Sequence, residues 1–83
     1  MIRILFFARV REEVGQARLE MPLPAGITTL GTLRDHLAAQ GEGWSYLSRC
    51  PNLRTALNQE LAPPETPLRE GDEVAFFPPV TGG

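Results

Sequence analysis

The sequence predicts a small α+β domain in which one main helix lies on one face of a mixed sheet. The first ten residues and residues 74–77 are the most apolar strand-like stretches, and only one long amphipathic helical pattern lies between them. The most apolar strands belong in the middle of a sheet, and these two, placed side by side, would be parallel. The order strand, strand, helix, strand, short strand, strand is that of the β-grasp, or ubiquitin-like, arrangement. A ferredoxin-like layout would need a second full helix.

Length and composition favour a single folded domain. The chain has 83 residues, of which 42% are hydrophobic and 22% are charged. No stretch approaches the ~18–20 apolar residues of a membrane span, and no signal-peptide pattern is present. The net charge of −2 and the scattered arginines argue against nucleic-acid binding. One cysteine, Cys50, cannot form an internal disulfide or a metal cluster. We therefore expect a soluble cytoplasmic protein with no metal, membrane or nucleic-acid partner.

The first two strands are predicted at residues 1–10 and 17–23. In the first, the side chains that face the core are Ile2, Ile4, Phe6, Ala8 and Val10. The opposite face carries Phe7 among arginines, which is unusual for a solvated surface. Residues 12–16 indicate a turn, with Gly15 able to adopt a positive φ, so the two strands are most simply a hairpin.

The main helix is predicted to begin after Thr28 or Thr29, because either residue can cap a helix. Apolar residues then recur at helical spacing through Ala38, and Gly41 suits the position after the helix. His36 is expected to face solvent and to have no catalytic role, since a single histidine without a partner is weak evidence for a site.

The second half of the chain is predicted to add three strands. Residues 42–52 are the least legible, although Trp44, Tyr46 and Leu47 are expected to seal one end of the core on a short helical turn. A third strand at 53–58 leads through a tight turn into a brief strand at Leu61. The proline-containing residues 62–67 form a loop, and residues 68–73 turn into the last strand, 74–77.

Strand alternation predicts an uncovered apolar surface. If Val74 and Phe76 join the core, Phe77 emerges on the same outer surface as Phe7. With one helix, only one face of the sheet is covered, so Leu5, Ala75 and Leu61 would also lie exposed there. The outward-facing residues Arg9 and Arg11 would then form a polar rim, and the patch would bind a partner. Two alternatives are scattered surface apolar residues, which are normal, and a one-residue error in strand register.

Residues 78–83 form a predicted tail beyond a domain that spans residues 1–77. Two prolines end the strand, because proline has no N–H for the ladder, and two glycines close the chain. A frayed end or a cloning remnant is one interpretation. The other is a rod of at most roughly 20 Å that presents a reactive terminal carboxylate to a narrow channel, since glycine has no side chain to block it.

Three stretches resemble the family of molybdopterin synthase small subunits, which are ubiquitin-like sulfur carriers. They are IRILFFARVRE at 2–12, LNQ at 57–59 and, most specifically, GDEVAFFPPVTGG at 71–83. The length and element order fit across the whole chain. The stretch from Trp44 to Asn52 carries no family motif.

The resemblance implies a sulfur-transfer cycle centred on Gly83. An E1-like activating enzyme would use ATP to adenylate this glycine, and a desulfurase or rhodanese-like donor would convert it to a thiocarboxylate. The tail residues Val80, Thr81 and Gly82 would enter the synthase large subunit, where the sulfur passes to cyclic pyranopterin monophosphate. Matching positions on the docking surface, by the same resemblance, are Phe7, Arg11, Leu61 and Phe77. The chain itself would bind no cofactor and would not be an enzyme on its own.

Three other functions stay open from the sequence. A carrier for thiamine synthesis would also end in Gly-Gly, although such chains are usually shorter and lack the Phe-Phe-Pro-Pro-Val run. A ubiquitin-like modifier would be joined to target lysines; the absence of lysine from this chain argues only against polymers of itself. A β-grasp interaction domain with an inert tail is the third. A persulfide relay at Cys50 is disfavoured, because nothing near it in the sequence would lower its pKa.

Overall fold

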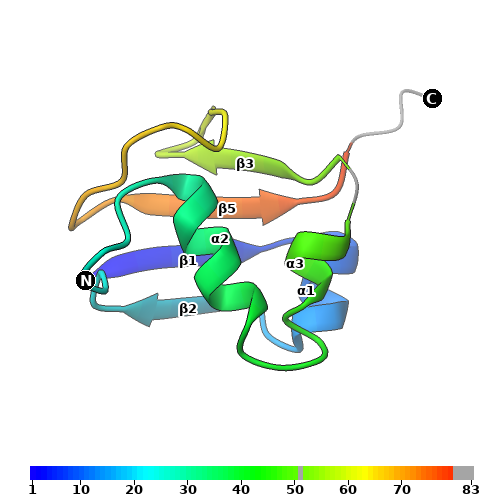
Figure 1. The fold of residues 1–83 in the computed structure, drawn as a ribbon. Coiled ribbons are helices and arrows are strands. Elements are labelled where there is room, and N and C mark those ends of the chain that lie inside the picture. Colours follow the sequence, from blue (N-terminus) through cyan, green and yellow to red (C-terminus); the bar gives the residue numbers. More distant parts are fainter. Residues whose placement is uncertain (51, 80–83) are drawn as a thin grey trace.

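Five strands form one mixed sheet in a computed structural model that describes residues 1–50 and 52–79 (Figure 1). The strands are β1 (Ile2–Phe6), β2 (Arg18–Met21), β3 (Arg54–Leu57), β4 (Glu60–Leu61) and β5 (Glu73–Phe77), and the helices are α1 (Ala8–Val14), α2 (Leu30–Ala38) and α3 (Tyr46–Arg49). Their order across the sheet is β2-β1-β5-β3-β4, with β1 and β5 parallel. This is the predicted β-grasp arrangement, with the first and last strands side by side in the interior of the sheet.

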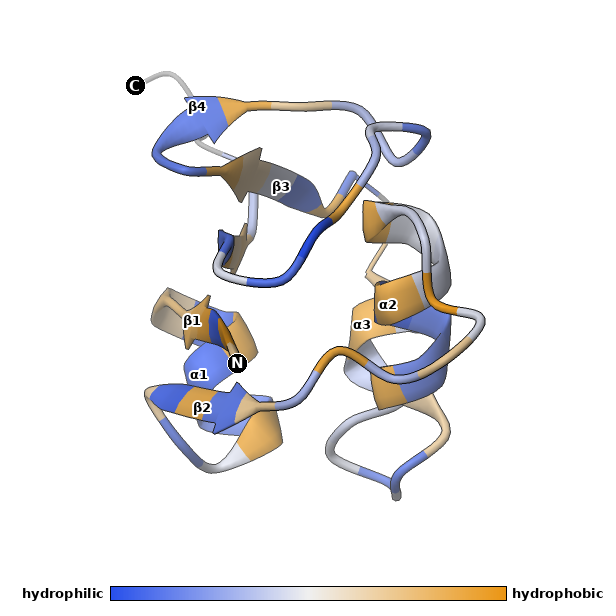
Figure 2. Cartoon of the chain, turned by 90° about the vertical axis from the view of Figure 1, so that its left-hand side faces the viewer, coloured by the Kyte–Doolittle hydropathy of each residue, from blue (hydrophilic) through white to orange (hydrophobic). Residues whose placement is uncertain are grey.

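The core lies between the sheet and the helices α2 and α3, which Figure 2 shows on the same side of the sheet. Alternate residues of the two interior strands point into it and are almost fully buried, as predicted: Ile2, Ile4, Phe6, Val74 and Phe76. From α2 they meet the buried leucines Leu30, Leu33 and Leu37. Among the described residues, no helix lies over the opposite face of the sheet (Figure 2).

Helix α2 begins where the sequence predicts and ends sooner. Thr29 is the N-cap: its hydroxyl accepts a hydrogen bond from the backbone N–H of Thr32, and the Thr32 hydroxyl accepts one from the N–H of Thr29. The last helical residue is Ala38, and the C-cap is Ala39 in a right-handed conformation. The prediction that Gly41 ends this helix is therefore wrong, because the chain leaves the helix without a left-handed residue there.

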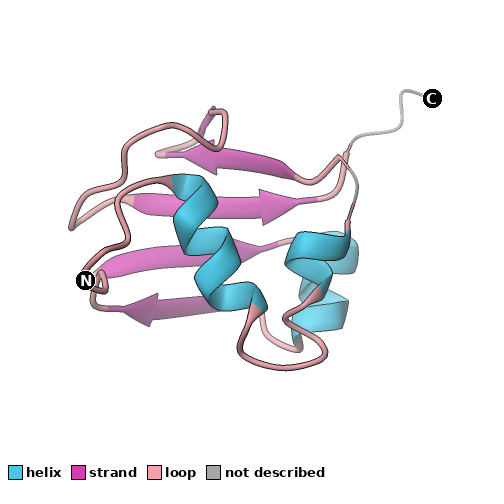
Figure 3. Ribbon diagram, in the orientation of Figure 1, coloured by secondary structure: helices cyan, strands magenta, loops and turns pink. Residues whose placement is uncertain are grey.

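The first strand is shorter than predicted, because α1 replaces its second half (Figure 3). The Phe7 N–H donates to the Phe76 carbonyl at 3.2 Å, as in a parallel ladder. The next ladder bond would run to the Phe7 carbonyl from residue 78, which is a proline and has no N–H. The Phe7 carbonyl instead accepts from the backbone N–H of Val10 at 3.1 Å, and a helix begins. Ala8 makes the sharp turn between strand and helix with a φ of 52°.

The connection between β1 and β2 is therefore a helix and not a simple hairpin turn. The two strands do pair antiparallel, with Ile2 opposite Met21. Gly15 ends α1 with a φ of 88°, and its N–H donates to the Arg11 carbonyl at 2.8 Å. The positive φ predicted at Gly15 is confirmed, but it terminates a helix.

The stretch from 42 to 50 closes one end of the core, as expected for Trp44, Tyr46 and Leu47. Leu47 of α3 is 1% exposed, and the Trp44 ring meets the Phe6 ring edge-on, with 5.5 Å between ring centroids. Gly43 is required by packing, because a Cβ there would overlap the backbone carbonyl oxygen of Glu13. His36 is half-buried in a hollow that Trp44 also lines, so it is less exposed than predicted.

The Glu70 carboxylate joins the start of β1 to the loop that follows β2. One oxygen accepts from the amino group of Met1, with which it forms an ion pair, and the other accepts from the backbone N–H of Leu23 at 2.9 Å. Both contacts lower the pKa of Glu70 below its ordinary value, and the contact with the Met1 amino group has the larger effect.

Replacing Glu70 with glutamine is expected to lower the free energy of unfolding at neutral pH, and to lower it by a smaller amount at acidic pH. A carboxylate whose pKa is lower in the folded state stabilises the fold above its unfolded pKa, about 4.3, and this stabilisation is lost as the pH falls through the folded pKa. Urea unfolding of both proteins from about pH 7 to about pH 3 measures the effect. A difference that stays constant over this range would contradict the prediction.

Candidate docking face

The groove on the outer face of the sheet follows from strand register. Leu5 of β1 lies opposite Ala75 of β5, which in turn lies opposite Ala56 of β3. Ala56 then faces Leu61 of β4. Because these residues share one face, the two alanines form a low floor between two leucines. A groove of about 430 Å³ results, and it is lined by Leu5, Phe7, Ala56, Gln59, Leu61, Glu73, Ala75 and Phe77.

Two phenylalanines stand at the end of this groove where β5 finishes. Phe7 lies beyond the last residue of β1 but keeps an extended backbone, with φ −123° and ψ 151°, so its side chain stays on the outer face. It is 47% exposed, and Leu61 is 70% exposed. Phe77, the last residue of β5, is half-buried. The structure thus brings together Phe7, Leu61 and Phe77, as strand alternation predicts; their role in binding a partner stays a prediction.

The two arginines predicted for the rim are in α1 and not in a strand. Arg11 is exposed, but it is not among the residues that line the groove. Arg9 forms an ion pair with Glu13 one helical turn later, at 2.9 Å. The prediction that Arg9 and Arg11 form a rim assumed that both lie in the first strand. It is therefore wrong, because the residues after Phe7 form a helix. The docking role of Arg11 rests on family resemblance alone.

The other end of the groove is polar and internally paired. Glu73 forms an ion pair with Arg3 at 3.4 Å, and its backbone N–H donates to the side-chain oxygen of Asn58 at 3.0 Å. Asn58 and Gln59 have φ of 50° and 72°, as in the tight turn predicted there. Asn58 also donates to Asp72 at 3.2 Å, so one side chain holds this turn against the start of β5.

The predicted tail residues Val80, Thr81, Gly82 and Gly83 lie outside the described residues, and their roles stay predictions. β5 ends at Phe77, and Pro78 and Pro79 follow without regular structure. The groove therefore borders the point where the chain leaves the sheet.

The described residues offer no preformed metal centre, since they contain no group of three or more histidine, cysteine or carboxylate side chains placed to hold an ion. Within the same part of the chain, no helix has the length and apolarity that a bilayer crossing requires. Cys50 is half-buried beside Tyr46. The hydrogen bond between the Cys50 and Tyr46 side chains raises the pKa of the Tyr46 hydroxyl, and burial of that hydroxyl raises it further.

Comparison with known proteins places the chain in a family. The model of the ThiS family matches residues 4–83. The molybdopterin synthase sulfur carrier subunit of Escherichia coli is 49% identical over 83 residues, which cover 100% of both chains.

Solved structures give the same fold. The small archaeal modifier SAMP1 of Haloferax volcanii superposes with a TM-score of 0.70 at 28% identity, over 99% of this chain and 98% of that one. A chain from the complex of subunits 1 and 2 of the molybdopterin-converting factor of Helicobacter pylori gives 0.65 at 26% identity, over 99% and 97%. The fold, the 71–83 motif and the end-to-end identity lead to one conclusion: this chain belongs to the ThiS family of β-grasp proteins, and within it to the molybdopterin synthase sulfur carrier subunits.

Proposed function

We propose that this chain is the sulfur carrier subunit of a molybdopterin synthase and supplies sulfur for molybdenum cofactor biosynthesis. The observation that carries the proposal is identity of 49% along the entire length of a protein with that name. The structure adds a physical reason: an apolar groove ends at Phe77, next to the prolines that begin the tail. A partner seated in the groove would hold the tail at a fixed starting point.

The proposed reaction takes place at Gly83, the last residue of the sequence. A terminal carboxylate, with a pKa of ~3.3–3.7, is ionised at neutral pH and resists substitution. Adenylation with ATP releases pyrophosphate and makes AMP the leaving group. The terminal sulfur of a donor persulfide then displaces AMP, and a thiol reductant cleaves the resulting acyl disulfide to leave the thiocarboxylate. Transfer of that sulfur to cyclic pyranopterin monophosphate, with water hydrolysing the acyl–sulfur bond, returns the carboxylate. The chain provides the carried group, and the acid–base groups that act on the pterin belong to the large subunit.

Three partners follow from this cycle: the synthase large subunit, an E1-like adenylyltransferase and a desulfurase or rhodanese-like sulfur donor. The large subunit has additional support, because the similar Helicobacter pylori structure is a complex of subunits 1 and 2. ATP is consumed by the activating enzyme, and this chain binds no cofactor of its own. The need for ATP makes the cytoplasm the expected compartment.

Intact-mass spectrometry tests the proposal. Protein purified from native cells should include a fraction that is heavier by the exchange of one oxygen for one sulfur, and fragmentation should place the exchange at Gly83. Unmodified chains alone, even after incubation with the activating enzyme, ATP and a sulfur donor, would count against any carrier function.

A protein modifier is the second candidate, because the similar Haloferax volcanii structure is that of a small archaeal modifier. The same mass measurement, together with a test of cofactor synthesis in cells, separates the two functions. A modifier would appear as a branched peptide in which Gly83 is joined to a lysine of another protein, whereas a molybdenum-pathway carrier would restore cofactor synthesis in cells that lack their own small subunit. A thiamine carrier would form the thiocarboxylate but fail in that restoration.

A further inference from the structure

Arg54 lies beside the base of the tail on the outer face of the sheet. It is the first residue of β3, and the antiparallel register places it opposite Phe77, the last residue of β5. Ala56, two residues later on the same face, belongs to the floor of the groove. A protein that covers Phe77 and takes up the tail must therefore also approach Arg54.

The charge of Arg54 is not balanced within the part of the chain that the structure describes. The ion pairs there involve Met1 with Glu70, Arg3 with Glu73, Arg9 with Glu13, and Arg34 with Asp35. At the polar end of the groove Glu73 is paired with Arg3, whereas the tail end carries a guanidinium with no described carboxylate within ion-pair distance. The outer face thus has a net positive charge next to Phe77.

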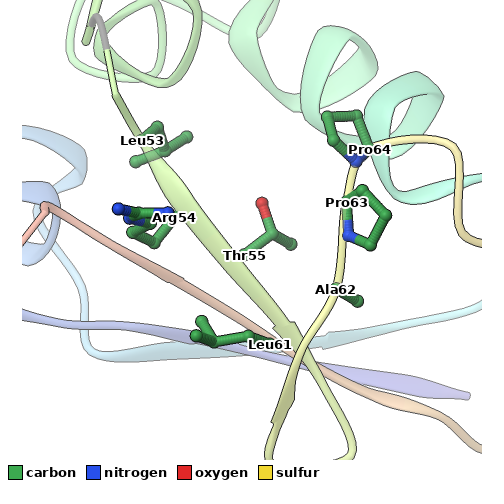
Figure 4. Close-up of a pocket in the computed structure, with 7 residues that line it drawn as sticks. All are labelled: Leu53, Arg54, Thr55, Leu61, Ala62, Pro63 and Pro64. Atoms are coloured by element: carbon green, nitrogen blue, oxygen red, sulfur yellow. The ribbon is translucent and has the colours of Figure 1, made fainter.

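A second hollow lies beside β3 and β4. It has a volume of about 370 Å³ and is lined by Leu53, Arg54, Thr55, Leu61, Ala62, Pro63 and Pro64 (Figure 4). Leu61 lines both hollows, so the two are adjacent at this side chain. Figure 4 shows Arg54 and Leu61 on the same side of β3, away from Pro63 and Pro64. Arg54 is the one charged residue in an otherwise apolar and threonine-containing lining.

We infer that Arg54 is a specificity-determining residue that binds a carboxylate side chain of the synthase large subunit at the tail end of the docking groove. This rests on the proposed function. The physical reason is desolvation: a partner that covers Phe77 and Leu61 removes water from the neighbouring guanidinium, and a buried charge is tolerated only when it is paired and hydrogen-bonded. A carboxylate accepts both parallel N–H groups of arginine, which fixes orientation as well as charge. The pair orients the carrier at the place where the tail begins.

Charge reversal tests this inference. Arg54→Glu should raise the Kd for the purified large subunit on the order of tenfold at ~50 mM salt, and the ratio to wild type should shrink at ~500 mM salt, because screening weakens both attraction and repulsion. Arg34→Glu is the matched control: it makes the same change of charge in α2, on the opposite face of the sheet, and should leave the Kd within about twofold of wild type. Circular dichroism checks that both variants are folded.

The outcomes separate the inference from the function on which it rests. If wild-type protein does not bind the large subunit, the proposed function fails and the inference fails with it. If wild type binds but Arg54→Glu binds equally well, or if Arg34→Glu weakens binding as much, the inference is overturned while the proposed function stands. Replacement of one aspartate or glutamate of the large subunit by arginine should restore binding to Arg54→Glu but not to Arg54→Leu. Failure of every such reversal to restore binding would show that no carboxylate faces Arg54.

Discussion

Phe77→Ala is expected to weaken binding to the large subunit about 30-fold or more while the domain stays folded. The side chain lies at the end of the outer groove, where a partner would complete its burial. Removing an aromatic side chain that a partner buries costs roughly 2 kcal/mol or more of binding free energy when it is a dominant contact. Because Phe77 is only partly buried in the free protein, the free energy of unfolding should fall by less than for a core phenylalanine, on the order of 1.5 kcal/mol. Calorimetric titration and urea unfolding measure the two quantities.

Phe76→Ala is the matched control, one residue earlier in β5 and on the other face of the sheet. Phe76 is fully buried and its ring stacks on that of Phe6, with 6.2 Å between centroids. Its loss should lower the free energy of unfolding by about 3–5 kcal/mol, a large part of the total for a domain of this size. If Phe77→Ala bound the large subunit with wild-type affinity, or if it unfolded the domain as Phe76→Ala does, the assignment of the outer face as a docking face would be wrong.

Removal of Gly83 is expected to abolish thiocarboxylate formation entirely. The activating enzyme must form an acyl bond to the terminal carboxylate, and a shortened tail presents that group one residue, about 3.3–3.6 Å, short of the reacting phosphate. Displacements much smaller than this cost catalysis about 100-fold. Reaction with the activating enzyme, ATP and a sulfur donor, followed by intact-mass measurement, gives the result directly.

Two controls make the Gly83 result specific. The shortened chain should unfold at the same urea concentration as the full chain, because in the sequence the deleted residue comes well after the last strand, which ends at Phe77. It should also bind the large subunit through the groove with affinity reduced less than by Phe77→Ala. A shortened chain that still acquired sulfur at its new end would show that the terminal glycine is not the carried group.

The outer groove could be predicted from the sequence because alternation along a strand is a local property. Leu5, Phe7, Ala75 and Phe77 fall on one face whatever their neighbours are, provided that the strand is real. The single long helical pattern further indicates that a helix can cover only one face of the sheet. Neither inference required knowledge of which strands pair.

Helix α1 could not be separated from a longer first strand by alternation alone. Ala8 and Val10 continue the period of two, and they also fit a helix in which Val10 and Val14 lie four residues apart and Gly15 follows. The i, i+4 pair of Arg9 and Glu13 was a usable signal for the helix. What decides between the two is the absence of an N–H at Pro78, and that matters only once β1 and β5 are known to pair in this register.

Arg54 and Ala56 were missed as parts of the docking face for the same reason. In the sequence they are two residues of a short strand about 20 positions before Phe77. Only the antiparallel register of β3 with β5 puts Arg54 next to Phe77 and Ala56 next to Ala75. Register between distant segments depends on core packing and turn geometry together.

The sequence by itself determined the order of the strands and the main helix, the side of the first and last strands that faces the core, and the family to which the closing motif belongs, because these depend on neighbouring residues. The tertiary structure decided where the first strand stops, that two alanines form the floor of the groove, and that an arginine lies at the base of the tail. These depend on pairing between residues that are far apart in the chain, which no local pattern records.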